Sequence, residues 1–268
     1  MTNSEFGGLK EVNEPELSIA EDTQNTEMQR AAHLANEWML AEETFNGEDV
    51  LHTISIFGSA RIPAPEKVPQ QNPCESLAHF YQQARQLAFR IGQYIEAEGL
   101  SQTRLITGGG PGIMEAGSRG ANEAGHASIG LNIALPHEQR LNPFIAAKHS
   151  INFQYFALRK MHFLKRAQAL IVFPGGFGTL DELFETLTLI QTGKMPRIPV
   201  FLYGKTFWNG LINLELLAAH NLIDPEDLAL YHLVDSVEEA WQEIQPILLR
   251  LKNETLVPSE KATQRKTD

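Results

Sequence analysis

Residues 172–182 read Val-Phe-Pro-Gly-Gly-Phe-Gly-Thr-Leu-Asp-Glu, and this stretch decides the expected fold. The apolar run at 169–173 suits a strand that is covered on both faces. Pro174 ends that strand, and the glycines allow backbone angles that a Cβ would block. Thr179 is expected to begin a helix, because apolar residues then recur near the 3.6-residue period, at Leu180, Leu183, Phe184, Leu187 and Ile190. The stretch therefore predicts a strand, a glycine turn and a helix, whose first amides can bind a phosphate.

Two more glycine turns follow predicted strands. The strand at 52–57 runs into Gly58 and Ser59, and the strand at 104–107 runs into three glycines at 108–110. Pro111 suits the first turn of the next helix. Strands that alternate with helices along the chain predict an α/β fold, a Rossmann-like doubly wound and mostly parallel sheet with helices on both faces. The three turns are then expected at the carboxyl edge of the sheet, around one crevice.

The chain is divided by composition and periodicity. Residues 1–24 are polar and acidic and are expected to be a disordered tail. Residues 25–50 have a helical period and form an N-terminal helical extension, which packs either on the main body or on a second subunit. The Rossmann-like domain is expected over 51–252, including a helix at 207–220. Residues 253–268 are expected to be a second disordered tail.

Composition excludes several classes of function. The net charge of −11 over 268 residues argues against a nucleic-acid or anionic-membrane surface. No apolar run approaches the ~18 residues of a membrane helix. Cys74 is the only cysteine, so one chain holds no disulfide framework and no cysteine zinc site. His137 and His149 lack metal-site spacing, so no metal is expected. The absence of a signal-peptide pattern and of paired cysteines predicts a cytoplasmic location.

The glycine turns favour a mononucleotide ligand. No Lys-Ser/Thr pair follows Gly178, so the turn is not a Walker A loop. Position 113 is isoleucine, so the glycines at 108–110 are not a dinucleotide fingerprint. Tight strand-to-helix turns alone explain any one of the three, but three turns around one crevice favour phosphate binding.

Glu182 has two interpretations. Thr179-Leu-Asp-Glu182 matches a capping box, in which the glutamate only closes the helix end. Alternatively, its carboxylate acts on a sugar attached to the bound phosphate, where positive charge develops. The sequence leaves both open, and Asp181 and Glu185 are expected to be solvated.

A basic helical stretch at 155–167 carries Arg159 and Lys160 just after a predicted strand. Such residues usually form a solvated face. In an acidic protein, cations at a helix start near the crevice also suit a phosphate or sugar. His162 is expected to be a packing or surface residue.

These residues resemble a known family. The segment 174–182 resembles the PGGxGTxxE signature of the LOG family, the cytokinin riboside 5′-monophosphate phosphoribohydrolases, many of which were formerly labelled "lysine decarboxylase". The blocks Gly108-Gly-Gly-Pro-Gly-Ile-Met-Glu115 and Leu158-Arg-Lys-Met161 resemble its two other motifs. The similarity runs from about residue 52 to 250 and is greatest to the longer bacterial members.

The resemblance implies an enzyme, a nucleotide N-glycosidase that needs no metal or redox cofactor and forms at least a homodimer. The implied reaction hydrolyses the N-glycosidic bond of a nucleoside 5′-monophosphate, such as AMP or N6-prenylated AMP, to the free base and ribose 5-phosphate. Prenylated AMP would place the protein in cytokinin biosynthesis. The implied catalytic pair is Arg159 and Glu182. The expected substrate-binding residues are Gly58, Ser59, Gly109, Gly110, Met114, Glu115, Lys160, Met161, Gly175, Gly176, Gly178 and Thr179.

Two alternatives stay open at this stage. A non-catalytic nucleotide or cofactor carrier on the same fold would need the glycine turns but not the Arg159–Glu182 pair. Phosphoribosyl transfer would use a nucleophile other than water. The sequence does not choose among AMP, GMP, CMP and prenylated AMP as the substrate. No lysine is marked as a pyridoxal phosphate anchor, so decarboxylation is not expected.

Overall fold

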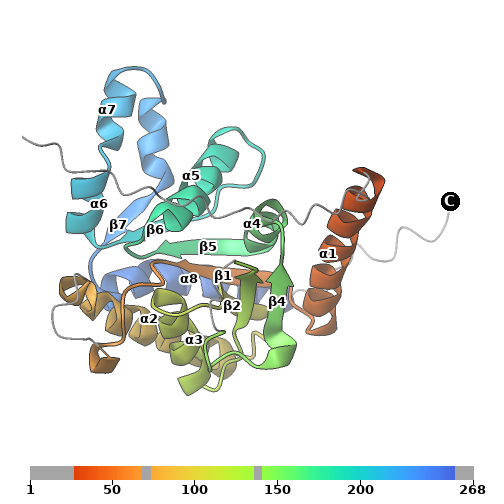
Figure 1. Ribbon diagram of the computed structural model, residues 1–268. Coiled ribbons are helices and arrows are strands. Elements are labelled where there is room, and N and C mark those ends of the chain that lie inside the picture. The colour runs from red at the N-terminus through yellow and green to blue at the C-terminus, as the bar shows by residue number, and fades with distance from the viewer. Residues whose placement is uncertain (1–26, 68–73, 136–140, 257–268) are drawn as a thin grey trace, which may run out of the picture.

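The computed structural model describes residues 27–67, 74–135 and 141–256 (Figure 1). The predicted tail at 1–24, most of the tail at 253–268, and His137 lie outside the described residues. Within the described residues, seven parallel strands form one sheet in the order β4-β3-β2-β1-β5-β6-β7. The strands are β1 (His52–Phe57), β2 (Thr103–Thr107), β3 (Ile129–Ile133), β4 (Ser150–Phe153), β5 (Ala167–Val172), β6 (Val200–Tyr203) and β7 (His232–Val234).

The strand order places the predicted crevice. The chain builds the sheet outward from β1 to β4 and then returns, so that β5 pairs with the other side of β1. This reversal between β1 and β5 is a topological switch point, and the crevice outside the carboxyl ends of the strands at such a point is where ligands bind in doubly wound folds. The predicted α/β fold is confirmed.

Helices cover both faces of the sheet, as Figure 1 shows for α2, α3 and α8 on one side and α4 and α5 on the other. Side chains along β5 alternate between the two cores: Ala169 and Ile171 pack with the first group, and Leu170 and Val172 with the second. The helices are α1 (Glu27–Gly47), α2 (His79–Ala97), α3 (Ile113–Glu123), α4 (Phe156–Lys165), α5 (Phe177–Gln191), α6 (Lys205–Leu211), α7 (Leu214–Ala219) and α8 (Val237–Leu256). Short 3₁₀ turns occur at Pro65–Lys67, Glu75–Leu77, Ala147–His149 and Pro225–Leu230.

Several helix boundaries differ from the prediction. Helix α5 begins at Phe177, two residues before the predicted start at Thr179, and α3 begins at Ile113, so Pro111 precedes the helix. Glycine's low helix propensity hid the true start of α5 in the sequence pattern. The helix predicted at 207–220 is two helices, because Ile212 is extended and the next helix has its own cap. Helix α8 continues to Leu256, past the predicted domain end at 252.

The N-terminal helix α1 lies at one end of the molecule beside α4 and β4 (Figure 1). It packs on the body through Ala41 and Phe45, which are fully buried. No described helix is both long enough and apolar enough to cross a lipid bilayer.

Candidate active site

The three glycine turns meet at the carboxyl edge of the sheet and are hydrogen-bonded to one another. Ser59 in the first turn donates its N–H to Pro174 O in the third turn, at 3.0 Å. Its carbonyl oxygen accepts the N–H of Ile113, the first residue of α3, also at 3.0 Å. The predicted convergence of these turns is therefore a property of the backbone itself.

A cleft of about 700 Å³ opens beside these turns. It is lined by Phe57, Gly58, Ser59, Ala60, Arg61, Gly108, Met114, Ile133, Leu135, Phe156, Arg159, Gly175, Gly176, Phe177, Gly178, Thr179, Leu180, Asp181, Glu182 and Leu211.

The turn after β5 has the geometry of an anion-binding site. A Cβ at Gly175 would come within 2.1 Å of the Thr179 hydroxyl, so only glycine fits. The N–H groups of Thr179 and Leu180 both donate to Gly176 O. The amides of Phe177 and Gly178 open the helix, and the first amides of a helix lack intrahelical acceptors. These amides, with the positive end of the α5 dipole, can hold a phosphate.

Glu182 lies on the buried side of α5 and lines this cleft. The capping-box interpretation is wrong, because the N-cap is Gly176 and Glu182 is the sixth residue of the helix, in its second turn. The side chain is 6% exposed, and its Oε2 atom has no hydrogen-bond partner among the described residues. Burial raises the pKa of Glu182 to about 7, against the opposing charges of Arg159 and Lys160. A carboxyl group with such a pKa can exchange protons at neutral pH.

Arg159 reaches the same cleft from α4. Its Nε donates to Leu131 O at 2.8 Å, and its guanidinium lies 5.3 Å from the ring centre of Phe163. Burial lowers the pKa of Arg159, and the negative charge of Glu182 opposes that shift. The structure thus brings the two residues of the predicted catalytic pair to one cleft from two different helices.

Of the other predicted binding residues, Gly58, Ser59, Met114, Gly175, Gly176, Gly178 and Thr179 line the cleft, whereas five others do not. Gly109 and Gly110 lie behind it, where their carbonyl oxygens accept hydrogen bonds from the Asn142 side chain. Met161 is half exposed and lies outside the lining.

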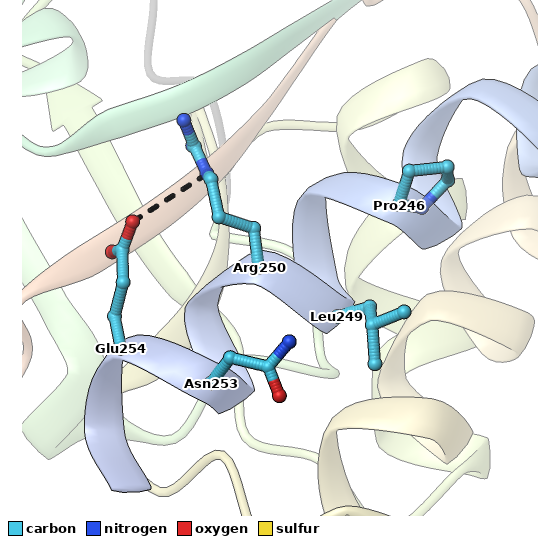
Figure 2. A pocket seen from close by; sticks show the side chains of 5 residues that line it. All are labelled: Pro246, Leu249, Arg250, Asn253 and Glu254. Atoms are coloured by element: carbon cyan, nitrogen blue, oxygen red, sulfur yellow. Dashed lines mark ion pairs between the residues drawn. The ribbon is translucent and has the colours of Figure 1, made fainter. Parts of the chain in front are cut away.

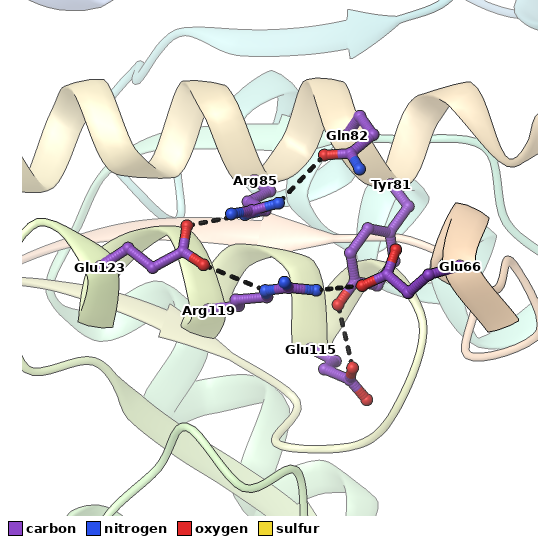
Figure 3. Close-up of polar contacts among 7 residues, drawn as sticks. All are labelled: Glu66, Tyr81, Gln82, Arg85, Glu115, Arg119 and Glu123. Atoms are coloured by element: carbon purple, nitrogen blue, oxygen red, sulfur yellow. Dashed lines mark hydrogen bonds and ion pairs between the residues drawn. The ribbon is translucent and has the colours of Figure 1, made fainter.

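Lys160 and Glu115 are also outside the lining. Lys160 forms ion pairs with Asp181 at 2.8 Å and Glu185 at 3.0 Å, so these two acids, expected to be solvated, are paired instead. Glu115 accepts a hydrogen bond from the Tyr81 hydroxyl at 2.9 Å (Figure 3).

Glu115 belongs to a polar cluster that joins α3 to α2. In this cluster Arg119 pairs with Glu66 and Glu123, and Arg85 donates to Glu123 and Gln82 (Figure 3). Burial and the carboxylate of Glu115 raise the pKa of Tyr81 to about 12. The cluster holds α3 in place behind the second glycine turn.

Sequence reasoning missed the apolar part of the cleft. Phe156, Leu135 and Leu211 line it, and Phe177 at the start of α5 is 91% exposed. Phe177 stands inside the glycine motif at 174–182, and Phe156 follows a predicted strand at the same edge of the sheet as the glycine turns, so these two positions carried a signal. Leu135 and Leu211 reach the cleft from segments without a motif.

A second hollow lies along α8 and is lined by Pro246, Leu249, Arg250, Asn253 and Glu254 (Figure 2). Its two charges pair with each other at 3.8 Å. Arg250 also donates to Gln168, which is at the amino end of β5, so this hollow is at the opposite edge of the sheet from the glycine turns.

His162 is fully buried among aromatic rings, as a packing residue. No group of acidic, histidine and cysteine side chains among the described residues could hold a metal ion.

Comparison with known proteins gives matches to part of the chain. A family model described as "Possible lysine decarboxylase" matches residues 114–244. The chain is 31% identical over 128 residues to the pyrimidine/purine nucleotide 5′-monophosphate nucleosidase of Escherichia coli K12, covering 44% of this chain and 27% of that protein. It is 31% identical over 107 residues to a probable cytokinin riboside 5′-monophosphate phosphoribohydrolase of Oryza sativa subsp. japonica, covering 39% of this chain and 41% of that protein. The matched segment thus spans less than half the length of these curated relatives.

Solved structures with a likeness include the molybdenum cofactor carrier protein of Chlamydomonas reinhardtii, which is 20% identical with a TM-score of 0.47 and covers 74% of this chain and 98% of that one. Another is the molybdenum cofactor binding protein of Rippkaea orientalis, which is 24% identical with a TM-score of 0.46 and covers 74% of this chain and 97% of that one. Likenesses this distant do not bear on function.

Proposed function

From the premise that this chain is a relative of the LOG family, we propose that it hydrolyses the N-glycosidic bond of a nucleoside 5′-monophosphate. The products are the free base and ribose 5-phosphate, and the proposed substrates are AMP and N6-prenylated AMP. The observation that carries the proposal is the buried carboxyl group of Glu182, which faces a cleft shared with Arg159 and a glycine-rich helix start. A cleft built only to carry a nucleotide has no need of an acid with a raised pKa.

The phosphate is proposed to sit in the turn of Gly175, Gly176 and Gly178, against the first helical amides, those of Phe177 and Gly178, at the positive end of α5. Gly58, Ser59, Met114 and Thr179 complete the binding residues. A helix rises about 1.5 Å per residue. Glu182, five residues beyond the first helical residue Phe177, is therefore about 7.5 Å further along the axis. That separation leaves room for a sugar ring between the bound phosphate and the carboxyl group.

Cleavage of a ribosyl C–N bond passes through a state with positive charge on the sugar, as in glycoside hydrolysis. The C1′–N bond breaks and leaves its electron pair on the base nitrogen, while the oxygen of a water molecule bonds to C1′. Glu182 stabilises the sugar cation and takes a proton from that water, and the base nitrogen takes up a proton from solvent, so that the base leaves neutral. Arg159 holds the ribose phosphate and counters the buried negative charge. The phosphate supplies binding energy far from the reacting carbon.

The relationship also leads us to propose a homodimer or a higher homo-oligomer in the cytoplasm. The exposed face of α5 supports it, because Phe177 and Phe184 are 91% and 38% exposed and lie with Leu180 and Leu189 around one shallow hollow. Light scattering of the purified protein would measure the number of subunits.

The central test is to incubate the purified protein with AMP and to measure released adenine. Adenosine is the matched substrate without the phosphate. We expect its kcat/KM to be lower by roughly a thousandfold, because two or three charge-assisted hydrogen bonds at about 1.5–3 kcal/mol each are lost.

Three results would redirect the proposal. Equal turnover of adenosine and AMP would contradict the proposal that the turn after β5 binds the 5′-phosphate. Tight AMP binding without any release of adenine would favour the carrier function. Release of adenine only in the presence of a second acceptor would favour phosphoribosyl transfer over hydrolysis.

Gly108→Ala is expected to lower kcat/KM for AMP by about a hundredfold, the effect of displacing a positioned group by about 1 Å. A Cβ at Gly108 would come 2.5 Å from Nη2 of Arg159 and 2.6 Å from Sδ of Met114, so the guanidinium must move. The control is Gly210→Ala in α6, whose Cβ would meet nothing within 4 Å. Wild-type kinetics in the Gly108 variant would show that the position of Arg159 is unimportant.

A further inference from the structure

Helix α1 holds α4, the helix that carries Arg159, at both of its ends. From these contacts we propose that Glu37 of the N-terminal extension is a positioning residue, which holds Arg159 in the cleft by capping α4 from outside. The inference rests on the proposed function for its kinetic consequence, although its structural part can be tested without any activity.

Glu37 binds the N-cap residue of α4 and the residue before it, one with each carboxylate oxygen. Its Oε2 accepts the N–H of Gln154 at 2.9 Å, and its Oε1 accepts the N–H of Tyr155 at 3.2 Å. Tyr155 is the N-cap residue of α4, and its own side chain makes no capping hydrogen bond. The amides at a helix start need acceptors, and a negative charge there is also favoured by the helix dipole. Here a residue 117 positions earlier in the chain supplies the acceptor.

One residue connects this cap to the cleft. Tyr155 donates its N–H to Glu37, and its carbonyl oxygen accepts the N–H of Arg159 at 3.2 Å. The N-cap residue Tyr155 is thus bound through its N–H to α1 and through its carbonyl oxygen to the backbone of Arg159. The side chain of Arg159 donates a hydrogen bond to Leu131 O, so its position depends on the distance between the first turn of α4 and β3. A shift of that turn would therefore displace the guanidinium from its place in the cleft.

The other end of α4 is held by Glu42. Its carboxylate accepts two hydrogen bonds from Arg166, both at 2.9 Å, and pairs with Lys165 at 2.7 Å. The hydrogen bonds from Arg166 lower the pKa of Glu42 to about 2, so this contact persists well below neutral pH. With α4 only ten residues long, the two glutamates of α1 span it from one end to the other.

The test compares Glu37→Ala with Glu43→Ala, a control on the exposed part of the same helix. Kinetics are measured well below the melting temperature of each variant. We expect the KM for AMP to rise roughly fivefold to tenfold in the Glu37 variant, in line with the typical loss of a helix cap. Glu37→Gln keeps one acceptor oxygen for these amides, replaces the other with an NH2 donor and removes the charge, so it is expected to recover only part of that loss. Hydrogen exchange of a peptide covering 154–159 is expected to accelerate in Glu37→Ala alone.

A purely structural role predicts a lower melting temperature with unchanged KM and kcat, and that result would overturn the inference. If the wild-type protein releases no base from any nucleotide, the proposed function fails by itself. The inference is then decided by exchange of 154–159 together with the Kd of AMP, measured by calorimetry. Exchange and Kd equal to those of the Glu43 variant would overturn it, whereas faster exchange with a raised Kd would support it.

Discussion

Glu182→Gln is expected to lower kcat for AMP by roughly a thousandfold. This is the typical size of a general acid–base contribution combined with a partial loss of electrostatic stabilisation of the sugar cation. The amide fills the same space beside the cleft but cannot take a proton or stabilise a sugar cation. Since Glu182 is not a helix cap, α5 should form as before. The rate of adenine release under saturating AMP gives the measurement.

The same substitution should stabilise the protein at neutral and higher pH. The pKa of Glu182 is about 7 in the folded protein against 4.5 for the free side chain, so the folded state binds this proton more tightly than the unfolded state does. Stability is therefore lost as pH rises from 4.5 to about 7, by up to about 3 kcal/mol. Glu182→Gln removes this loss, and its melting temperature should exceed that of the wild type above pH 7.

The matched control is Glu185→Gln on the same helix, where the carboxylate pairs with Lys160 outside the cleft. It should keep activity within a few fold and gain no stability at high pH. Full activity in the Glu182 variant would remove this residue from the mechanism. A loss of activity accompanied by a lower melting temperature would indicate a structural role instead.

Arg159→Met is expected to lower kcat/KM for AMP by roughly a hundredfold to a thousandfold, because a charge-assisted contact to the nucleotide and the counter-charge of Glu182 are both lost. The positive charge of Arg159 lowers the pKa of Glu182. Its removal should therefore raise that pKa. Because the ionised carboxylate is the active form, the rise of kcat/KM with pH should move from about pH 7 to higher pH.

Two variants separate charge from shape at this position. Arg159→Lys keeps the charge, so its pH profile should stay near that of the wild type while kcat/KM falls, because a lysine lacks the planar fork of donors. Arg250→Met changes an arginine at the opposite edge of the sheet and should leave the kinetics unchanged. If the rise of kcat/KM with pH lies at the same pH in Arg159→Met as in the wild type, then ionisation of Glu182 does not cause that rise.

Most of the fold could be predicted from the sequence, and the site only in part. The strand at 52–57 has its predicted bounds, because a short apolar run between breakers is a local signal. The Gly175 turn was equally readable, since its glycine is required by a contact only four residues away, with Thr179. The predicted start of α5 is two residues too late, because glycines at 176 and 178 are poor helix formers and the sequence there does not look helical. In the structure the N–H groups of Thr179 and Leu180 donate to Gly176 O and close the first turn of the helix.

The sequence by itself determined the order of strands, glycine turns and helices, and with it the edge of the sheet where the cleft lies, because these depend on periodicity and on backbone preferences of neighbouring residues. Only the tertiary structure decided which of the marked residues reach the cleft: Glu182 does, buried beside Arg159, while Gly109 lies behind it against Asn142. It also showed that α1 caps α4 through Glu37, a contact between residues 117 positions apart. Such contacts depend on how separate segments pack together, and no local pattern in the chain encodes them.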